Sequence, residues 1–132
     1  MKIKKYTGVI MLGAIMLLIS GCSQSGKTTY YSEPTEGQNI REENGVQIIH
    51  VLARGGYTPN RISAQAGKPT KLEIETKGTY DCSSSFTIPS LGYRTQLPAT
   101  GKTLVDIPSQ EKGTKLTAAC SMGMYSFDVM FN

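Results

Sequence analysis

From Val46 onward the sequence consists of short apolar runs separated by turn residues, and this pattern constrains the fold more than any other feature. Leu72 and Ile74 alternate with charged neighbours, as in a strand with one face in water. No stretch keeps its apolar residues at the 3.6-residue helical period. The runs expected to form strands cover residues 46–52, 57–65, 71–75, 86–88, 95–97, 104–107, 114–120 and 125–131. Seven or eight short strands in residues 46–132 predict an all-β fold, a small β-sandwich of the Greek-key type.

The first 21 residues have the layout of a secretory leader. Three lysines form a basic start, and the apolar run 9–19 is shorter than the ~20 residues of a membrane span. Ile19-Ser20-Gly21-Cys22 resembles a bacterial lipobox, in which the cysteine is lipidated and becomes the first residue of the mature protein. We therefore expect residues 1–21 to be a lipoprotein signal peptide and Cys22 to carry the lipid; an uncleaved anchor is the alternative. Either way, the rest of the chain is expected at the cell membrane on its extracytoplasmic side.

Residues 22–45 are expected to be a flexible tether. They are rich in Ser, Thr, Gly, Gln, Asn and Glu, with few sizeable apolar side chains. Such a segment buries too little apolar surface to offset the entropy of ordering it. The folded domain is therefore expected to span residues 46–132.

The charge of the expected mature chain argues against nucleic-acid binding. The formal charge is +4, but three of the 14 basic residues are leader lysines, so 11 basic and 10 acidic residues remain from Cys22 onward. The basic residues are scattered along the sequence and form no cluster. A nearly neutral domain has little electrostatic attraction for phosphates, so we expect no nucleic-acid partner.

The most distinctive chemistry lies in the sulfur-rich segment Cys120-Ser121-Met122-Gly123-Met124. Thiolate and thioether ligands select soft metal ions, above all Cu(I). Cys82 supplies a second thiolate if its loop lies at the same end of the sandwich. With Cys22 lipidated, however, Cys82 and Cys120 are also an even pair in an oxidising compartment, so a structural disulfide is the alternative interpretation.

The single histidine, His50, argues against two other classes of function. A blue-copper electron-transfer site needs two imidazoles beside its thiolate, and an isolated histidine in a strand is more often a packed or surface residue. No Ser-His-Asp constellation is identifiable, so we expect no enzyme. Structural roles are expected for three further residues. Asp81, next to Cys82, is most simply a turn residue, and Tyr125 is expected to be a wall of the site. Met130, in the last strand, is expected to be a packing or surface residue.

Several motifs resemble one known family. Tyr57-Thr58-Pro59, Ala66-Gly67-Lys68-Pro69, Cys82 followed by residues 86–92, and Cys120-Ser121-Met122-Gly123-Met124-Tyr125 are similar to the cupredoxin-like Cu(I)-binding domain. That domain occurs in membrane-anchored copper chaperones of the CupA type and in certain copper-exporting P-type ATPases. Relatives often have glycine where this chain has Ser121, but no sulfur is lost.

The resemblance implies copper ligands at Cys82, Cys120, Met122 and Met124 and the binding of one or two Cu(I) ions. It also implies a copper-exporting P-type ATPase or another copper acceptor as partner of a monomeric domain. An exporter takes copper from the cytoplasmic side, whereas the lipobox places this domain outside, so the direction of transfer stays open. We expect a copper chaperone or buffer in copper homeostasis and resistance; the alternative is a surface interaction module with a β-sandwich stapled by a Cys82–Cys120 disulfide.

Overall fold

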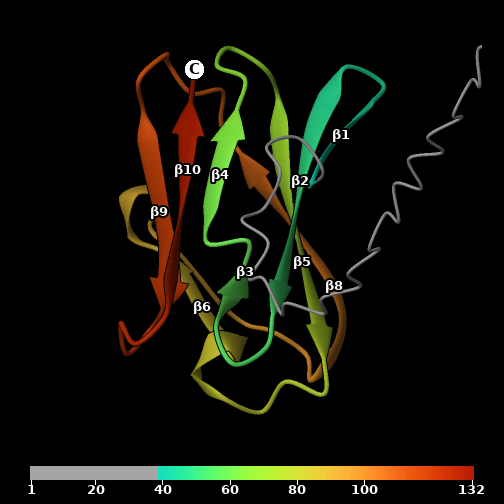
Figure 1. Ribbon diagram of the computed structural model, residues 1–132, viewed down its shortest axis with the longest axis vertical. Helices are drawn as coiled ribbons and strands as arrows, with labels where there is room; N and C mark the ends of the chain where they lie inside the picture. The colour runs from blue at the N-terminus through green and yellow to red at the C-terminus, as the bar shows by residue number, and fades with distance from the viewer. Residues whose placement is uncertain (1–38) are drawn as a thin grey trace, which may run out of the picture. The chain divides into compact units, whose positions relative to one another are not determined.

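The structure, a computed structural model, describes residues 39–132, which form two β-sheets packed face to face (Figure 1). The predicted signal peptide, Cys22 and most of the predicted tether lie outside this range. The first sheet has the order β1 (Ile40–Glu43), β2 (Val46–Ala53), β5 (Thr70–Lys77), β8 (Thr100–Ile107), with β3 (Tyr57–Thr58) also paired to β2. The second has the order β4 (Arg61–Ala64), β10 (Ser126–Phe131), β9 (Lys115–Cys120), β6 (Ser85–Ile88), β7 (Tyr93–Gln96).

The chain crosses between the two sheets several times, as a Greek-key sandwich requires. β2 pairs in parallel with β5, and β4 pairs in parallel with β10, while all other pairs in the described residues are antiparallel. Parallel neighbours cannot be joined by a tight hairpin, so the chain leaves each sheet and returns to it. Two short 3₁₀ helices, η1 (Cys82–Ser84) and η2 (Pro89–Leu91), flank β6. The prediction of an all-β sandwich is confirmed.

Residues 39–132 contain ten strands rather than seven or eight, for two physical reasons. The expected run 57–65 is divided at Pro59 and Asn60, so that β3 joins the first sheet and β4 joins the second. Proline has no N–H to continue a ladder, which favours a break at this point. The second reason is β1, which lies within the range 22–45 expected to be tether.

Long-range pairing stabilises β1, a strand with few apolar residues. Ile40 to Glu43 pair antiparallel with Ile49 to Val46 of β2. Arg41 donates to both carboxylate oxygens of Glu73 on β5, with Nη2–Oε2 at 2.8 Å, and Lys102 of β8 donates to Oε1 at 3.2 Å. The Glu73 carboxylate thus joins three strands of the first sheet on its outer face, and its pKa is lowered, first by the hydrogen bond from Arg41.

The core fills the space between the inward faces of both sheets. Ile49, Val51, Leu72 and Ile74 contribute from the first sheet and are at most 1% exposed. From the second sheet come four fully or nearly fully buried side chains, those of Phe86, Phe127, Phe131 and Ile88. An aromatic group surrounds Phe86, whose ring lies 6.2 Å from that of Phe127 and 6.0 Å from that of Tyr57. Burial of this apolar surface is the main source of stability.

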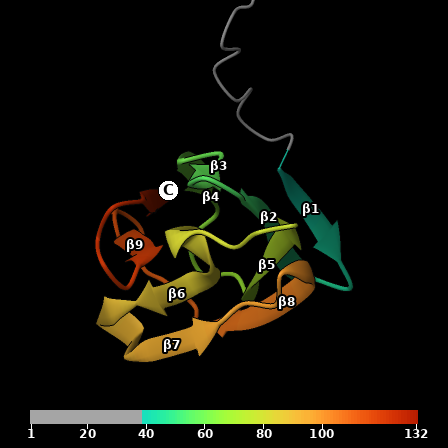
Figure 2. The same ribbon diagram turned by 90° about the horizontal axis from the view of Figure 1, so that it is seen from below.

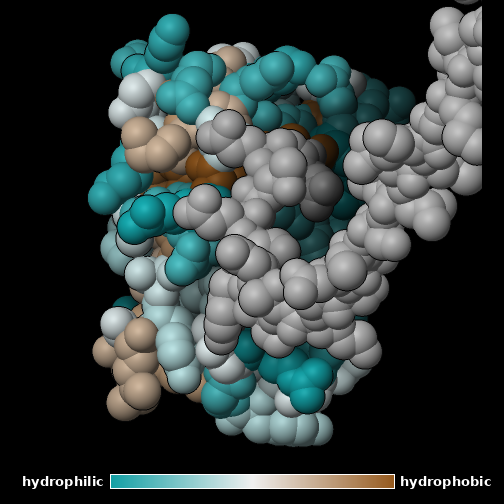
Figure 3. Space-filling model, viewed as in Figure 1, coloured by the Kyte–Doolittle hydropathy of each residue, from teal (hydrophilic) through white to brown (hydrophobic). Residues whose placement is uncertain are grey.

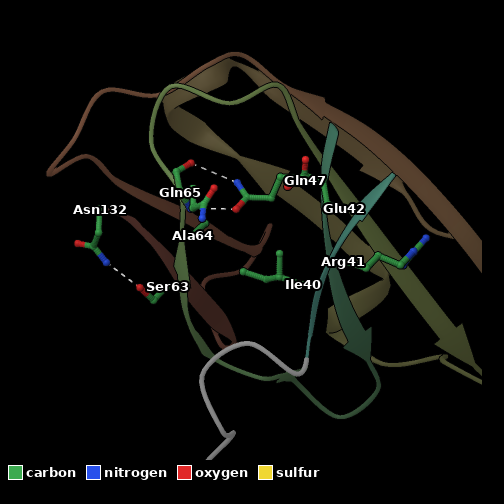
Figure 4. A pocket seen from close by; sticks show the side chains of 8 residues that line it. All are labelled: Ile40, Arg41, Glu42, Gln47, Ser63, Ala64, Gln65 and Asn132. Atoms are coloured by element: carbon green, nitrogen blue, oxygen red, sulfur yellow. Dashed lines mark hydrogen bonds between the residues drawn. The ribbon is translucent and has the colours of Figure 1, made fainter. Parts of the chain in front are cut away.

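At the end of the sandwich where β1 turns into β2, the buried side-chain amide of Gln47 is hydrogen-bonded to the backbone of Gln65 (Figure 4). Gln47 is 3% exposed; its amide nitrogen donates to the Gln65 carbonyl at 3.2 Å, and its amide oxygen accepts from the Gln65 N–H at 2.8 Å. These two bonds fix β2 against the connection that follows β4. In the described residues, no helix is long and apolar enough to cross a membrane.

Candidate metal centre

Three connections meet at one end of the sandwich, at the bottom of the view in Figure 1 and facing the viewer in Figure 2. They are residues 54–56 between β2 and β3, residues 78–84 between β5 and β6, and residues 121–125 between β9 and β10. The Gly55 N–H donates to Asp81 Oδ2 at 2.9 Å, and the Ser121 N–H donates to the Ser85 carbonyl at 2.8 Å. Residues far apart in sequence, including both candidate cysteines, are thereby brought to one pole.

Asp81 fixes the start of η1 and hence the position of Cys82. Its carboxylate caps the 3₁₀ helix by accepting from the Ser83 N–H at 2.8 Å and from the Ser83 hydroxyl, in addition to Gly55. These bonds, led by the Ser83 hydroxyl, hold the pKa of Asp81 below its ordinary value. The Tyr57 hydroxyl donates to the Ser83 carbonyl at 3.0 Å from the core side. The turn that carries Cys82 is therefore fixed by hydrogen bonds from Asp81 and, on the side of the core, by the hydrogen bond from Tyr57.

Cys120 ends β9 and is 1% exposed, opposite Phe86 of β6. The chain then makes a tight turn, in which the Gly123 N–H donates to the Cys120 carbonyl at 2.8 Å. Gly123 has φ of 72°, a left-handed conformation that favours glycine. The Tyr125 N–H points back to Cys120 Sγ at 3.4 Å. Cys120 is thus a buried sulfur that accepts a hydrogen bond from the loop that follows it.

The two thiols are free and close enough for each to shift the pKa of the other. The neighbouring Cys120 sulfur, followed by burial, raises the pKa of the half-buried Cys82. For Cys120, burial acts to raise the pKa, but the neighbouring Cys82 thiol and the backbone N–H groups of the loop outweigh it, so that its pKa is lowered. Of the two neighbouring thiols, Cys120 is therefore the one that more readily forms a thiolate.

Met122 and Met124 lie on the same loop with side chains that are 76% and 64% exposed. Figure 3 shows apolar surface over the β9–β10 connection at the lower left of the view. Tyr80, two residues before Cys82, is 86% exposed at the same pole. Exposed thioethers contribute little to packing, so these two methionines are available to a ligand that approaches from solvent.

Of the remaining candidates, His50 and Met130 lie away from the sulfur pair, whereas Tyr125 lies beside it, with its N–H on Cys120 Sγ. His50 is on the outer face of the first sheet, where its Nε2 lies 2.9 Å from Glu75 Oε2. Met130 is 38% exposed on β10, and Tyr125 packs partly against the core with its ring beside Gly56. Among residues 39–132, no group of three His, Cys, Asp or Glu side chains is placed to hold a metal ion. A metal at this pole would depend on sulfur ligands.

From the sequence, no role in the site was predicted for Tyr57, and Asp81 was predicted most simply to be a turn residue that could also tune Cys82. Burial raises the pKa of Tyr57, with a further contribution from the nearby Cys120, Cys82 and Asp81, so its hydroxyl remains a donor to the Ser83 carbonyl. Asp81 does cap a turn, but it also joins that turn to Gly55. The only sequence signal for this was an aspartate directly before a short Ser-rich segment, which is typical of an N-cap.

Comparison with known proteins places this geometry in context. A family model described as a cupredoxin-like domain matches residues 9–129. No curated protein sequence gives a significant match. Among solved structures, the metal-binding domain of the Cu(I)-exporting P-type ATPase CopA from Streptococcus pneumoniae D39, determined with Cu(I), is 22% identical with a TM-score of 0.62; the alignment covers 70% of this chain and 92% of that chain.

A second similar structure is the solution structure of a copper binding protein in its apo form. It is 28% identical, with a TM-score of 0.64, and the alignment covers 73% of this chain and 97% of that chain. Both similarities extend over the sandwich as a whole, so the fold of residues 39–132 is shared with these domains.

Proposed function

This chain belongs to the cupredoxin-like domain family, and from that premise we propose that it is a membrane-anchored Cu(I)-binding protein, a copper chaperone or buffer in copper homeostasis and resistance. The similar solved structures support this proposal, since one is a copper binding protein and another is a domain of a Cu(I)-exporting ATPase. The proposed role is to bind and exchange copper and includes no catalysis.

The observation that carries the proposal is that Cys82 and Cys120 are free thiols that lie near each other at one pole. Two methionines, Met122 and Met124, lie exposed on the loop that holds Cys120. We propose these four residues as the ligands of one or two Cu(I) ions. Two thiolates and two thioethers favour the reduced ion, because soft ligands stabilise Cu(I) over Cu(II).

The arrangement of the four sulfurs suits exchange. Thiolates bind Cu(I) strongly and release protons when they do so. Thioethers are neutral and weaker, so Met122 and Met124 can leave one at a time while an incoming sulfur from an acceptor takes their place. The copper then passes from one set of sulfurs to another without being free in solution.

We propose that the domain acts at the extracytoplasmic face of the cell membrane, anchored through a lipid on Cys22. Its partner would be a copper-exporting P-type ATPase or another copper acceptor that reaches this face. A membrane-impermeant thiol label applied to intact cells tests the location, because Cys82 is half-buried and therefore partly accessible. Labelling only after lysis would contradict the proposed side, and a membrane-bound chain whose Cys22 carries no lipid by mass spectrometry would contradict the lipid anchor.

The binding proposal is tested by anaerobic titration with Cu(I) in the presence of a chromogenic Cu(I) chelator as competitor. We expect Cys82→Ser and Cys120→Ser each to abolish tight binding, whereas Met122→Leu or Met124→Leu leaves one tightly bound copper. Met130→Leu is the matched control, because Met130 lies on β10 away from the pole. Full affinity in Cys82→Ser would refute the proposal. A thiol count that shows a Cys82–Cys120 bridge stable to mild reductant, without copper uptake, would favour the disulfide-stapled interaction module instead.

A further inference from the structure

A groove of about 620 Å³ runs along the outer face of the second sheet and ends at the sulfur loop. One wall is the turn from β6 to β7, and the other is the end of β9 with the loop that follows it. The floor and walls include six residues with mostly small or polar side chains, namely Thr87, Tyr93, Arg94, Ala119, Ser121 and Gly123. A volume of this size is typical of sites for small organic molecules, which lie between about 300 and 1,000 Å³.

Arg94 is the charged residue of this groove. Its side chain is exposed, and among residues 39–132 its guanidinium has neither an ion pair nor a hydrogen-bond partner. The carboxylate on the outer face of this sheet, that of Asp128, lies three strands away. It already accepts from Thr117 at 2.7 Å and faces Lys115 at 3.8 Å. The groove therefore presents one unneutralised cation.

The ladder registers fix how far Arg94 lies from the copper loop. Thr87 of β6 is opposite Arg94 on one side and opposite Ala119 on the other, so Arg94 and Ala119 are two strand spacings apart. Strands are spaced about 4.8 Å apart, which gives about 10 Å between these backbones. Ala119 directly precedes Cys120. A molecule the size of a short peptide could therefore place a sulfur at the copper loop and a carboxylate at Arg94 at the same time.

We propose that this groove binds the carboxylate end of a small thiol that carries Cu(I) to or from the sulfur site. This inference rests on the proposed copper exchange and adds the chemical class of the exchanging molecule. The guanidinium of Arg94 holds the carboxylate in a charge-assisted hydrogen bond, while the thiolate of the carrier shares the copper with the exposed methionines. On transfer, the carrier thiolate takes up a proton and a cysteine of the site loses one, so the exchange leaves the redox state unchanged.

The first test needs no copper and therefore does not depend on the proposed function. The metal-free protein is titrated with S-methylglutathione, which keeps the carboxylates but has a blocked thiol, and backbone amide shifts are followed by NMR. We expect saturable shifts at Thr87, Arg94 and Ala119, no such shifts with the carboxylate-esterified form, and loss of the shifts in Arg94→Gln. Saturable binding of the ester, or no saturable shift with the acid, would overturn the proposal. So would tighter binding of a thiol-free peptide of aspartate and glutamate, which would assign the groove to a protein partner.

The second test measures copper uptake by stopped-flow absorbance from Cu(I)–glutathione and from Cu(I)–glutathione ester. We expect faster uptake from Cu(I)–glutathione than from its ester. The ratio of the first rate to the second should fall about fivefold in Arg94→Gln, the effect of losing one ion pair at the surface. Arg94→Lys should retain part of the ratio, and Lys112→Gln, which removes an exposed cation from the β8–β9 connection, should retain all of it. An equal ratio in wild type and Arg94→Gln would overturn the inference, whereas absence of copper uptake from either donor would instead refute the proposed copper binding.

Discussion

Replacing Asp81 with alanine tests whether this carboxylate holds the cysteine-bearing turn in place. The change removes the acceptor for the Gly55 N–H at 2.9 Å, for the Ser83 N–H at 2.8 Å and for the Ser83 hydroxyl. Two segments, the β2–β3 connection and η1, then lose their common partner. We expect lower stability of the fold and a less fixed position for Cys82.

The size of the effect follows from the bonds that are lost. Removal of an N-cap acceptor costs about 0.5–2 kcal/mol. The bond to Gly55 adds to this, but Asp81 is only half-buried, so water replaces part of what is lost. We expect Asp81→Ala to lower the free energy of unfolding by about 2 kcal/mol, which corresponds to a fall in melting temperature of about 10 °C for a domain of this size. Asp81→Asn keeps an acceptor oxygen and should cost about half as much.

Urea unfolding followed by circular dichroism, with a reductant present, measures these differences. The pH dependence separates charge from geometry. The folded-state pKa of Asp81 is lowered, so its contribution is fully present above the unfolded-state pKa of about 3.9 and is lost as the pH falls through the lower folded-state value. The difference between wild type and Asp81→Asn should therefore be seen at neutral pH and disappear in strong acid. An Asp81→Ala variant within about 0.5 kcal/mol of wild type at neutral pH would refute the reasoning.

Three further substitutions have defined outcomes. Phe86→Ala removes a fully buried ring from the aromatic group and should lower the free energy of unfolding by about 3–5 kcal/mol in the same urea assay. Glu73→Gln loses the ion pairs to Arg41 and Lys102 and should cost about 2 kcal/mol at neutral pH. Because the folded-state pKa of Glu73 is lowered, this cost should shrink as the pH falls below the unfolded-state pKa and vanish below the folded-state pKa; an undiminished cost in strong acid would contradict the assignment. Gly123→Ala puts a Cβ on a residue with φ of 72° and should cost about 1 kcal/mol and weaken competition for Cu(I), whereas unchanged stability would show that the loop adopts another backbone conformation.

The strands that sequence reasoning located are those whose stability comes from their own apolar residues. The run expected at 46–52 is β2 (Val46–Ala53), and the run expected at 114–120 is β9 (Lys115–Cys120). Their inward side chains alternate with outward ones, so the pattern is visible in a short window.

The features that sequence reasoning missed depend on distant partners. β1 has the sequence Ile-Arg-Glu-Glu, which has no strand pattern, and its ion pair joins Arg41 to a residue 32 positions away. The role of Asp81 likewise depends on Gly55, 26 positions away. Neither contact can be inferred without the strand order, which a single sequence does not specify.

The expected metal site was in part recognisable from local sequence and in part dependent on distant contacts. Cys120 and its loop were recognisable from sulfur content alone, but the proximity of Cys82 required the β5–β6 and β9–β10 connections to lie at the same end of the sandwich. The structure brings the two thiols together. Whether all four sulfurs bind one ion stays a prediction for the titrations described above.

The burial of the four sulfurs suggests an order for copper release. Cys120 is 1% exposed and hydrogen-bonded by the Tyr125 N–H, whereas Met122 and Met124 are mostly exposed and Cys82 is intermediate. An acceptor approaching from solvent therefore meets the thioethers first. We expect Met122 and Met124 to be displaced first, Cys82 next and Cys120 last. On this order, Met122→Leu and Met124→Leu should change the rate at which an acceptor engages the copper more than they change the affinity, while loosening the turn with Gly123→Ala should speed the final release from Cys120.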